Sequence, residues 1–345
     1  MRFAAAILTM TALLCAGLAF GQPFSAAALL YITVFTFFMD KIVALAAPDA
    51  PGEEFPSGTS LSITLGITQF PILFWAVAVL SADGAGTTVD KILIFIAVSL
   101  YVGQVGNANA HELIHRAGRF ERRLGAAVYG SILFGHHASA HLRVHHVSAA
   151  TPDDPNSARL GEHFYAYALR AWIGSFKAGL AAESRMRAGK GGMHPYWGYG
   201  AVSAVSVATA LMIGGADGVL WYLAIAFYAQ AQLLLSDYVQ HYGLERQRDP
   251  DGGWMPIGPA HSWNAPHGFS SALMLNAPRH SDHHARPSRA YPGLALDRDS
   301  MPLLPQSLPV MAVLALVPPV WHRLMDHRAQ RLQARAQHIQ PVAAQ

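Results

Sequence analysis

The chain has 345 residues, of which 52% are hydrophobic and only 13% are charged. Soluble domains carry about 25% charged residues, so this composition indicates a membrane protein. The net charge of +3 gives no support for nucleic-acid binding, and the single cysteine, Cys15, excludes an intrachain disulfide and a thiolate-held iron–sulfur cluster.

The first apolar run, Phe3–Phe20, follows a single basic residue, Arg2. The small residues Ala16–Ala19 are compatible with a cleaved signal peptide. The next apolar run begins at Phe24, however, only four residues after Phe20, and this spacing is more typical of a helical hairpin. We therefore expect the first run to be a retained membrane span.

Six apolar runs come close to the length of about 20 residues that a helix needs to cross the hydrocarbon core. They predict six transmembrane helices over 3–20, 24–47, 61–80, 92–110, 196–215 and 219–236. Three prolines predict a loop over Pro48–Gly58. Two further apolar stretches, Leu124–Gly135 and Leu308–Trp321, are too short to span.

Basic residues are distributed very unevenly along the chain. Of the 24 lysines and arginines, only Arg2, Lys41 and Lys91 precede the end of the fourth predicted span. The others fall within residues 116–190, 246–298 and 323–335. By the positive-inside rule these segments are cytoplasmic. Six spans with both termini cytoplasmic satisfy this rule and predict a multi-pass protein of the cell (inner) membrane.

Three histidine clusters fall on this predicted cytoplasmic side. They contain His111 and His115, then His141, His145 and His146, then His280, His283 and His284, with His241 alone between the last two. Residues three or four apart share one face of a helix, so each cluster can direct its imidazoles toward a single point. Imidazole binds iron, zinc, copper and nickel. This many histidines would fill the coordination of more than one ion.

Other histidines have simpler interpretations. His163, His194, His322, His327 and His338 stand alone and are expected to be core or interfacial residues. His136 and His137 lie close to the second cluster, but we rank them below the clustered histidines as ligands.

Two alternative functions fit part of the pattern. His111-Glu112-Leu113-Ile114-His115 matches the zinc-protease motif, with Glu112 as general base. A protease needs only one further ligand, whereas this chain offers seven. A metal transporter would hold its ions near the bilayer midplane, but the charge-free predicted spans contain no histidine.

The combined pattern resembles the membrane-bound histidine-rich di-iron family of fatty-acid desaturases, xylene monooxygenase and alkane hydroxylases. Within that family, it is most similar to the alkane 1-monooxygenases. Asp237–Leu244 resembles their signature around a single ligand histidine, and Ala150–Pro155 resembles the segment after their second histidine box. Ser262–Asn264, followed by Arg279–Ala285, is similar to their last box. The resemblance runs from about Asn109 to Asp326.

This resemblance implies an all-α membrane protein in which residues 1–345 form one fatty-acid-desaturase-like domain. Six transmembrane helices would carry a cytoplasmic histidine-rich di-iron domain built from residues 109–160 and 237–300. The implied cofactor is two non-haem iron ions. The implied iron ligands are His111, His115, His141, His145, His146, His241, His280, His283 and His284.

Several positions depart from the family pattern. Ala140 and Gln240 stand where the family has Glu, and Asp237 stands where it has Asn. Arg116 replaces a Lys, and Pro278 replaces a Gln. No ligand is removed, but such changes alter charge and hydrogen bonding around a metal. Substrate and donor preference are therefore less well defined than the metal.

Four carboxylates are candidates for holding the ligand imidazoles by their distal N–H groups. They are Glu112, Asp153, Asp154 and Asp282. For Asp153 and Asp154, a solvated or helix-capping role is the alternative.

The implied reaction is dioxygen-dependent hydroxylation of the terminal carbon of an alkane or related hydrocarbon chain. Electrons must come from another protein, because no Gly-x-Gly-x-x-Gly turn for a flavin or nicotinamide occurs. Rubredoxin or ferredoxin, with its reductase, is the implied donor. An acyl-lipid desaturase of the same fold is the alternative enzyme. The apolar substrate would enter from the membrane lipid. Phe70, Phe74, Trp75 and Phe95 could line its path, although core packing is their expected role.

Overall fold

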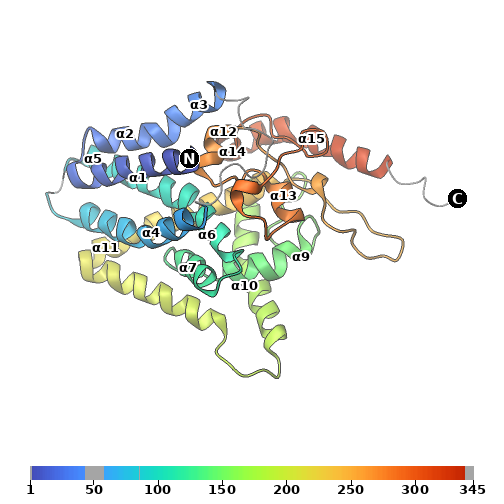
Figure 1. Cartoon of the computed structure of the whole chain (residues 1–345), viewed down its shortest axis with the longest axis horizontal. Helices are drawn as coiled ribbons and strands as arrows, with labels where there is room; N and C mark the ends of the chain where they lie inside the picture. Colours follow the sequence, from blue (N-terminus) through green and yellow to red (C-terminus); the bar gives the residue numbers. More distant parts are fainter. Residues whose placement is uncertain (1, 43–57, 85, 339–345) are drawn as a thin grey trace.

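A computed structural model of the chain describes residues 2–42, 58–84 and 86–338 (Figure 1). Its regular structure is helical, and the pairing of extended backbone within these residues is limited to two isolated bridges. The helices are α1 (Arg2–Phe20), α2 (Phe24–Leu30), α3 (Thr36–Ile42), α4 (Gly58–Ser81), α5 (Thr88–Tyr101), α6 (Asn107–Ile114), α7 (Arg119–Gly130), α8 (His137–Ala140), α9 (His146–Ser148), α10 (Phe164–Arg187), α11 (Pro195–His241), α12 (Gly268–Leu273), α13 (His280–Ala285), α14 (Leu308–Ala315) and α15 (Pro318–His338).

Short turns of other helical types join or follow these elements. Single 3-10 turns occur at Pro259–His261 and Tyr291–Gly293. π-helical turns at Tyr31–Phe35 and Val102–Gly106 make α2–α3 and α5–α6 continuous, and a third at His141–His145 links α8 to α9. The prediction of an all-helical protein is therefore confirmed.

Five helices are long and apolar enough to cross a membrane. They cover Phe3–Phe20, Phe24–Ile42, Gly58–Ser81, Thr88–Ile114 and Pro195–His241. The first four correspond to the first four predicted spans. Residues 43–47 of the second predicted span, and residues 48–57 of the predicted loop, lie outside the described residues.

The fifth and sixth predicted spans form the two arms of one element, α11, which contains 47 residues. Gly214 and Gly215 have non-helical backbone, and Gly215 has φ +58° and ψ −143°, a conformation that is essentially restricted to glycine. Beyond them, a Cβ added to Gly218 would lie 2.4 Å from the carbonyl oxygen of Ala210. Eight residues of straight helix would separate these positions by about 12 Å, so the chain reverses here.

The long helices lie side by side, and the histidine-bearing elements gather at one end of the bundle (Figure 1). α1 and α2 form the predicted hairpin, and α1 buries Ile7, Met10 and Leu14 completely or nearly so. α10 crosses the direction of the long helices and leads into α11. The ends of α6 and α11 meet α8, α9 and α13 and thereby position the candidate site.

Candidate metal centre

Nine imidazoles from separate parts of the chain converge into two groups at this end of the bundle. In each group the potential ligand atoms all lie within 4.8 Å of one another. The first group contains His111, His115, His141, His146 and His283, and the second contains His145, His241, His280 and His284. The structure therefore brings together all nine histidines that the sequence singles out.

Helix geometry explains how histidines that are close in sequence divide between the groups. His141 and His146 are five residues apart across a π-helical turn, whose i→i+5 hydrogen bonding brings them onto one side. His145, four residues after His141, points to the other group. On α13, the i and i+4 residues His280 and His284 join the second group, while the intervening His283 faces the first. The expectation that each cluster meets at one point is therefore wrong for the second and third clusters.

His141 lies at the middle of the first group. Its Nε2 atom is 2.9 Å from Nε2 of His111 and 3.0 Å from the Nε2 atoms of His115 and His146. The Nε2 atom of His146 is in turn 3.1 Å from that of His283. A neutral imidazole has a single N–H, so one nitrogen cannot hydrogen-bond all of these neighbours at once. A shared cation would satisfy their lone pairs together.

The second group repeats this arrangement around His280. Its Nε2 atom lies 2.9 Å from Nε2 of His241 and 3.0 Å from Nε2 of His284. His145 completes the group with a buried Nε2 atom that has no hydrogen-bond partner among the described residues. A buried nitrogen without a partner is costly unless something binds it. The donor set of each group therefore fits a metal ion.

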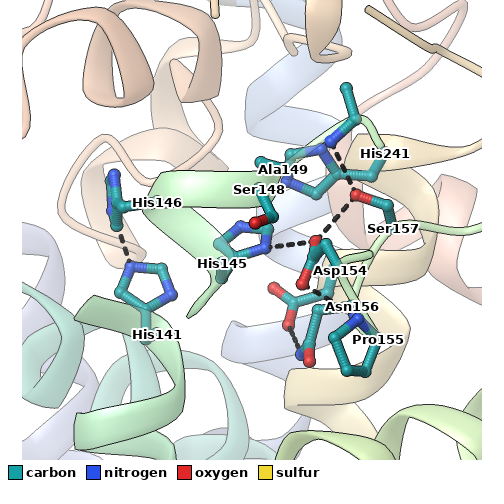
Figure 2. A network of polar contacts seen from close by, with 12 residues as sticks. His141, His145, His146, Ser148, Ala149, Asp154, Pro155, Asn156, Ser157 and His241 are labelled. Carbon is teal, nitrogen blue, oxygen red and sulfur yellow. Dashed lines mark hydrogen bonds and ion pairs between the residues drawn. The ribbon is translucent and has the colours of Figure 1, made fainter. Parts of the chain in front are cut away.

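His145 is held by a carboxylate on its other nitrogen (Figure 2). Its Nδ1 atom lies 2.8 Å from Oδ2 of Asp154, which also accepts a hydrogen bond from the Ser157 hydroxyl at 2.7 Å. Burial lowers the pKa of His145, but the Asp154 carboxylate more than offsets this and raises it. Burial acts to raise the pKa of Asp154, and His145 outweighs it, bringing that pKa to about 2. This pairing places a proton on Nδ1, so that in neutral His145 the lone pair of Nε2 is available to a metal ion.

Most of the other grouped histidines are neutral. Burial first, and then repulsion from neighbouring imidazoles, lowers the pKa well below its ordinary value in His115, His141, His146, His280, His283 and His284. Neutral imidazole is the form that binds metals. The site is thus prepared for a cation at physiological pH.

The other predicted carboxylates have different contacts. Glu112 pairs with Arg116 at 2.6 Å and accepts a hydrogen bond from the Tyr291 backbone at 3.3 Å. Asp282 accepts hydrogen bonds from Arg289 at 3.0 Å and from the Ala295 backbone at 2.9 Å. Asp153 is exposed. Among the described residues, only Asp154 of the four has the expected hydrogen bond to a grouped histidine.

Sequence reasoning missed several residues that support the site. The buried Arg246 donates hydrogen bonds at 2.7 Å to the carbonyl oxygens of both Val147 and Ala149, just after His146. Asn264 accepts a hydrogen bond from the Ser281 backbone at 2.9 Å and thereby fixes the start of α13. The sequence marks Ser262–Asn264 only through its resemblance to the family, and nothing in the sequence around Arg246 reveals its role.

An apolar cavity of about 410 Å³ reaches both groups. His111 and His141 of the first group and His280 of the second form part of its wall. Much of the remaining lining is aliphatic, including Leu100 of α5 and Leu308 of α14. Its shape and chemistry suit an apolar molecule brought next to the histidines.

Three of the aromatic residues considered for a substrate path pack against the core as expected, namely Phe70, Phe74 and Phe95, whereas Trp75 is 40% exposed. Phe74 stacks on Tyr222 with ring centroids 6.2 Å apart, and Phe95 contacts Trp221 at 5.6 Å. None of the four candidates lines the apolar cavity.

The remaining histidines near the site fall outside both groups. His137 stacks on Phe134 and also packs against Tyr129. His163 accepts a hydrogen bond from the backbone at the start of α10, and His194 does the same at the start of α11. These contacts agree with the structural roles expected for them.

Comparison with known proteins provides independent information. The sequence model of a family described as fatty acid desaturase matches residues 91–314. Alkane 1-monooxygenase 2 of Alcanivorax borkumensis is 31% identical over 275 residues, which cover 78% of this chain and 71% of that protein. Alkane 1-monooxygenase 1 of Pseudomonas aeruginosa is 31% identical over 297 residues, or 82% and 77% of the two chains. The hydroxylase component of a Pseudomonas putida xylene/toluene monooxygenase is 27% identical over 226 residues, or 63% and 58%.

Proposed function

The chain belongs to the fatty acid desaturase family, and we propose that it is a di-iron monooxygenase that hydroxylates the terminal carbon of alkanes or related hydrocarbon chains. Its similarity to proteins named alkane 1-monooxygenase supports the reaction and the substrate class. The observation that carries the proposal is the apolar cavity whose wall includes histidines of both groups.

The proposed cofactor is two non-haem irons, one for each histidine group. His111, His115, His141, His146 and His283 would hold one iron, and His145, His241, His280 and His284 would hold the other. Neutral imidazole nitrogens suit iron, and family membership favours it over zinc or copper. When bound, the irons would supply dioxygen activation, inserting one oxygen atom into a C–H bond while two electrons and two protons reduce the other to water.

The protein's own residues supply positioning and the exclusion of water. Aliphatic side chains such as Leu100 and Leu308 would hold an extended hydrocarbon and exclude water from the reacting carbon. Asp154 would hold His145 in the tautomer with Nε2 free. Arg246 would keep the segment after His146 in place through its two backbone contacts.

We further propose that the chain crosses the cell membrane six times, with both termini and the histidine groups on the cytoplasmic side. The two arms of α11 would provide the fifth and sixth crossings. The concentration of arginine and lysine after residue 115 supports this orientation. A cytoplasmic rubredoxin or ferredoxin could then deliver electrons near the histidine groups.

Product analysis tests the reaction directly. The purified protein, supplied with reduced rubredoxin, dioxygen and octane or hexadecane, should yield the 1-alcohol. His280→Ala should abolish the product, because His280 lies at the middle of the second group. Formation of an alkene from an acyl substrate, with no alcohol from alkanes, would instead identify an acyl-lipid desaturase of the same fold.

A further inference from the structure

A second cavity, of about 620 Å³, lies among α7, α10, the start of α11 and the segment that carries His141. Six cationic side chains line it, together with a single carboxylate, Glu183. The cationic residues are Arg119, Arg122, Arg123, Arg143, Arg187 and Lys190. Neither the proposed reaction nor the metal centre uses this basic pocket.

Helical spacing concentrates these charges in one place. Arg119, Arg122 and Arg123 occupy positions i, i+3 and i+4 of α7 and therefore share a face. Glu183 and Arg187 have the same i, i+4 relation on α10, which faces α7 across the pocket. The basic pocket is thus formed by the facing sides of two helices.

Most of the positive charge in the pocket is not neutralised. Glu183 is 7% exposed, lies 3.3 Å from Arg187 and 3.8 Å from Arg143, and accepts a hydrogen bond from Ser139 at 2.9 Å. Arg122 donates hydrogen bonds to the backbone before α7. The side chains of Arg119, Arg123 and Lys190 have no ion-pair partner among the described residues. An anion with several oxygens would complement them.

The pocket adjoins a candidate membrane span, and the helices that form it carry exposed apolar side chains. Pro195 and Tyr199, in the first turns of α11, line the pocket. Met186, which lines the pocket, is 46% exposed in the isolated chain. Phe120 of α7 and Trp197 of α11 do not line it, but they belong to helices that form it and are 57% and 74% exposed. An exposed tryptophan at the start of a span is typical of the lipid headgroup level.

We propose that the basic pocket binds the phosphate headgroup of an anionic membrane lipid. The cations would contact the phosphate oxygens, while the acyl chains would run along the exposed apolar side chains and the outside of α11. Basic pockets at the cytoplasmic end of membrane helices suit such headgroups, and this pocket meets that description at the start of α11 if the orientation proposed above holds. A docked soluble protein fits less well, because the rim of such an interface is polar.

Lipid binding here would also brace the metal centre. Ser139 and Arg143 lie on either side of His141, and both contact Glu183 of α10. A headgroup that contacts both Arg143 and Arg187 would therefore hold α10 against the segment carrying the second histidine cluster. This inference does not depend on the reaction, so it can fail or succeed separately from the proposed function.

Native mass spectrometry of the full-length protein in detergent, titrated with cardiolipin, tests the proposal. Arg119→Gln/Arg123→Gln should weaken the tightest cardiolipin binding by about 30-fold, since each basic residue near a membrane surface contributes appreciably. Arg331→Gln/Arg335→Gln removes the same charge from exposed positions on α15 and should leave that binding unchanged. Phosphatidylcholine should not compete.

Three results would overturn the proposal. Equal cardiolipin binding by both double variants would place the site elsewhere, and displacement of cardiolipin by millimolar inorganic phosphate would indicate an unspecific anion site. Unchanged cardiolipin binding combined with weaker binding of reduced rubredoxin would identify a protein docking surface. If the α7 variant does not fold, Lys190→Gln, at an exposed position after α10, removes one charge from the pocket and should still weaken cardiolipin binding relative to Arg331→Gln.

Discussion

His145 differs from the other grouped histidines because a buried carboxylate, Asp154, holds its Nδ1 atom at 2.8 Å. A carboxylate behind a ligand imidazole fixes the tautomer and increases the basicity of the ligating nitrogen. The sequence identified Asp154 as a candidate for this role but did not distinguish it from Asp153. Only the turn after α9 buries one and exposes the other.

Asp154→Asn should therefore weaken metal binding in the second group. We expect a loss of about 10- to 100-fold in affinity, the usual effect of removing such a partner. The iron content that remains after dialysis against a chelator measures this loss of affinity. Asp153→Asn is the matched control, because its exposed side chain should contribute little. Equal iron retention by Asp154→Asn and wild type would contradict this role.

The pKa shifts of the histidines predict how the metal-free protein responds to acid. Six imidazoles have a folded-state pKa well below the ordinary value of 6.5, mainly because of burial. Below pH 6.5 the unfolded chain therefore binds more protons, and stability falls as the pH decreases, by up to about 1.4 kcal/mol per pH unit for each group. The raised pKa of His145 stabilises the folded protein at low pH, but this single group opposes six that destabilise it.

Thermal unfolding of the metal-free protein at a series of pH values from 8 to 5 checks this. The midpoint should fall progressively below pH 6.5, whereas above pH 6.5 only the smaller loss of the His145 contribution is expected as the pH rises through its raised pKa. The metal-loaded protein should resist acid to a lower pH, because bound imidazoles cannot protonate. A midpoint that is independent of pH, or that rises on acidification, would show that these rings are not buried and neutral.

At the scale of the elements, the sequence predicted the convergence of the nine histidines but not their division into two groups. Convergence follows from cluster spacing and from the common side of the predicted spans. The division depends on the π-helical turn at His141–His145 and on the helical spacing within α13, where His280 and His284 join one group and His283 the other. A π turn inserts one residue into a helical repeat and has no reliable signature in a single sequence.

Hydrophobicity also predicts some helix boundaries better than others. The apolar runs located α4 and the continuous helix α5–α6 (Thr88–Ile114) to within about four residues, because hydrophobicity alone defines a span. Residues 216–218, which include Asp217, separate the fifth and sixth predicted spans, so the sequence predicts the reversal within α11 at these residues. It occurs at Gly214 and Gly215 instead, where glycine permits the required backbone conformation.

α5 provides a test of the apolar cavity as the substrate site. Leu100 lines the cavity 11 residues before His111, about 16 Å away along the helix. Leu100→Phe should shorten the cavity and reduce turnover of hexadecane relative to octane by roughly tenfold, as expected for a steric change in an apolar site. Gas chromatography of the alcohol products measures this ratio.

The exposed Leu169 on α10 is the control position for the same substitution. Leu169→Phe should leave the hexadecane-to-octane ratio unchanged. An unchanged ratio in Leu100→Phe as well, with normal folding, would mean that long substrates do not occupy this part of the cavity.

At the scale of the whole molecule, one end of a helical bundle carries both histidine groups. The long apolar helices contribute the cavity that reaches these groups, and the shorter elements after α6 contribute most of the imidazoles (Figure 1). This separation of apolar helices from histidine-bearing elements is already visible in the sequence. The first four predicted spans are nearly free of charge, whereas the basic and histidine-rich segments follow residue 110. An apolar substrate could thus reach the centre from the membrane, and a polar electron donor could reach it from the aqueous side.

The central claim is that the two histidine groups each hold an iron ion. Elemental analysis of the purified full-length protein tests it most directly. We predict about two irons per chain for wild type and about one for His241→Ala, whose missing imidazole belongs to the second group alone. Iron content that is unaffected by this substitution, or a chain that retains zinc or copper in place of iron, would contradict the claim.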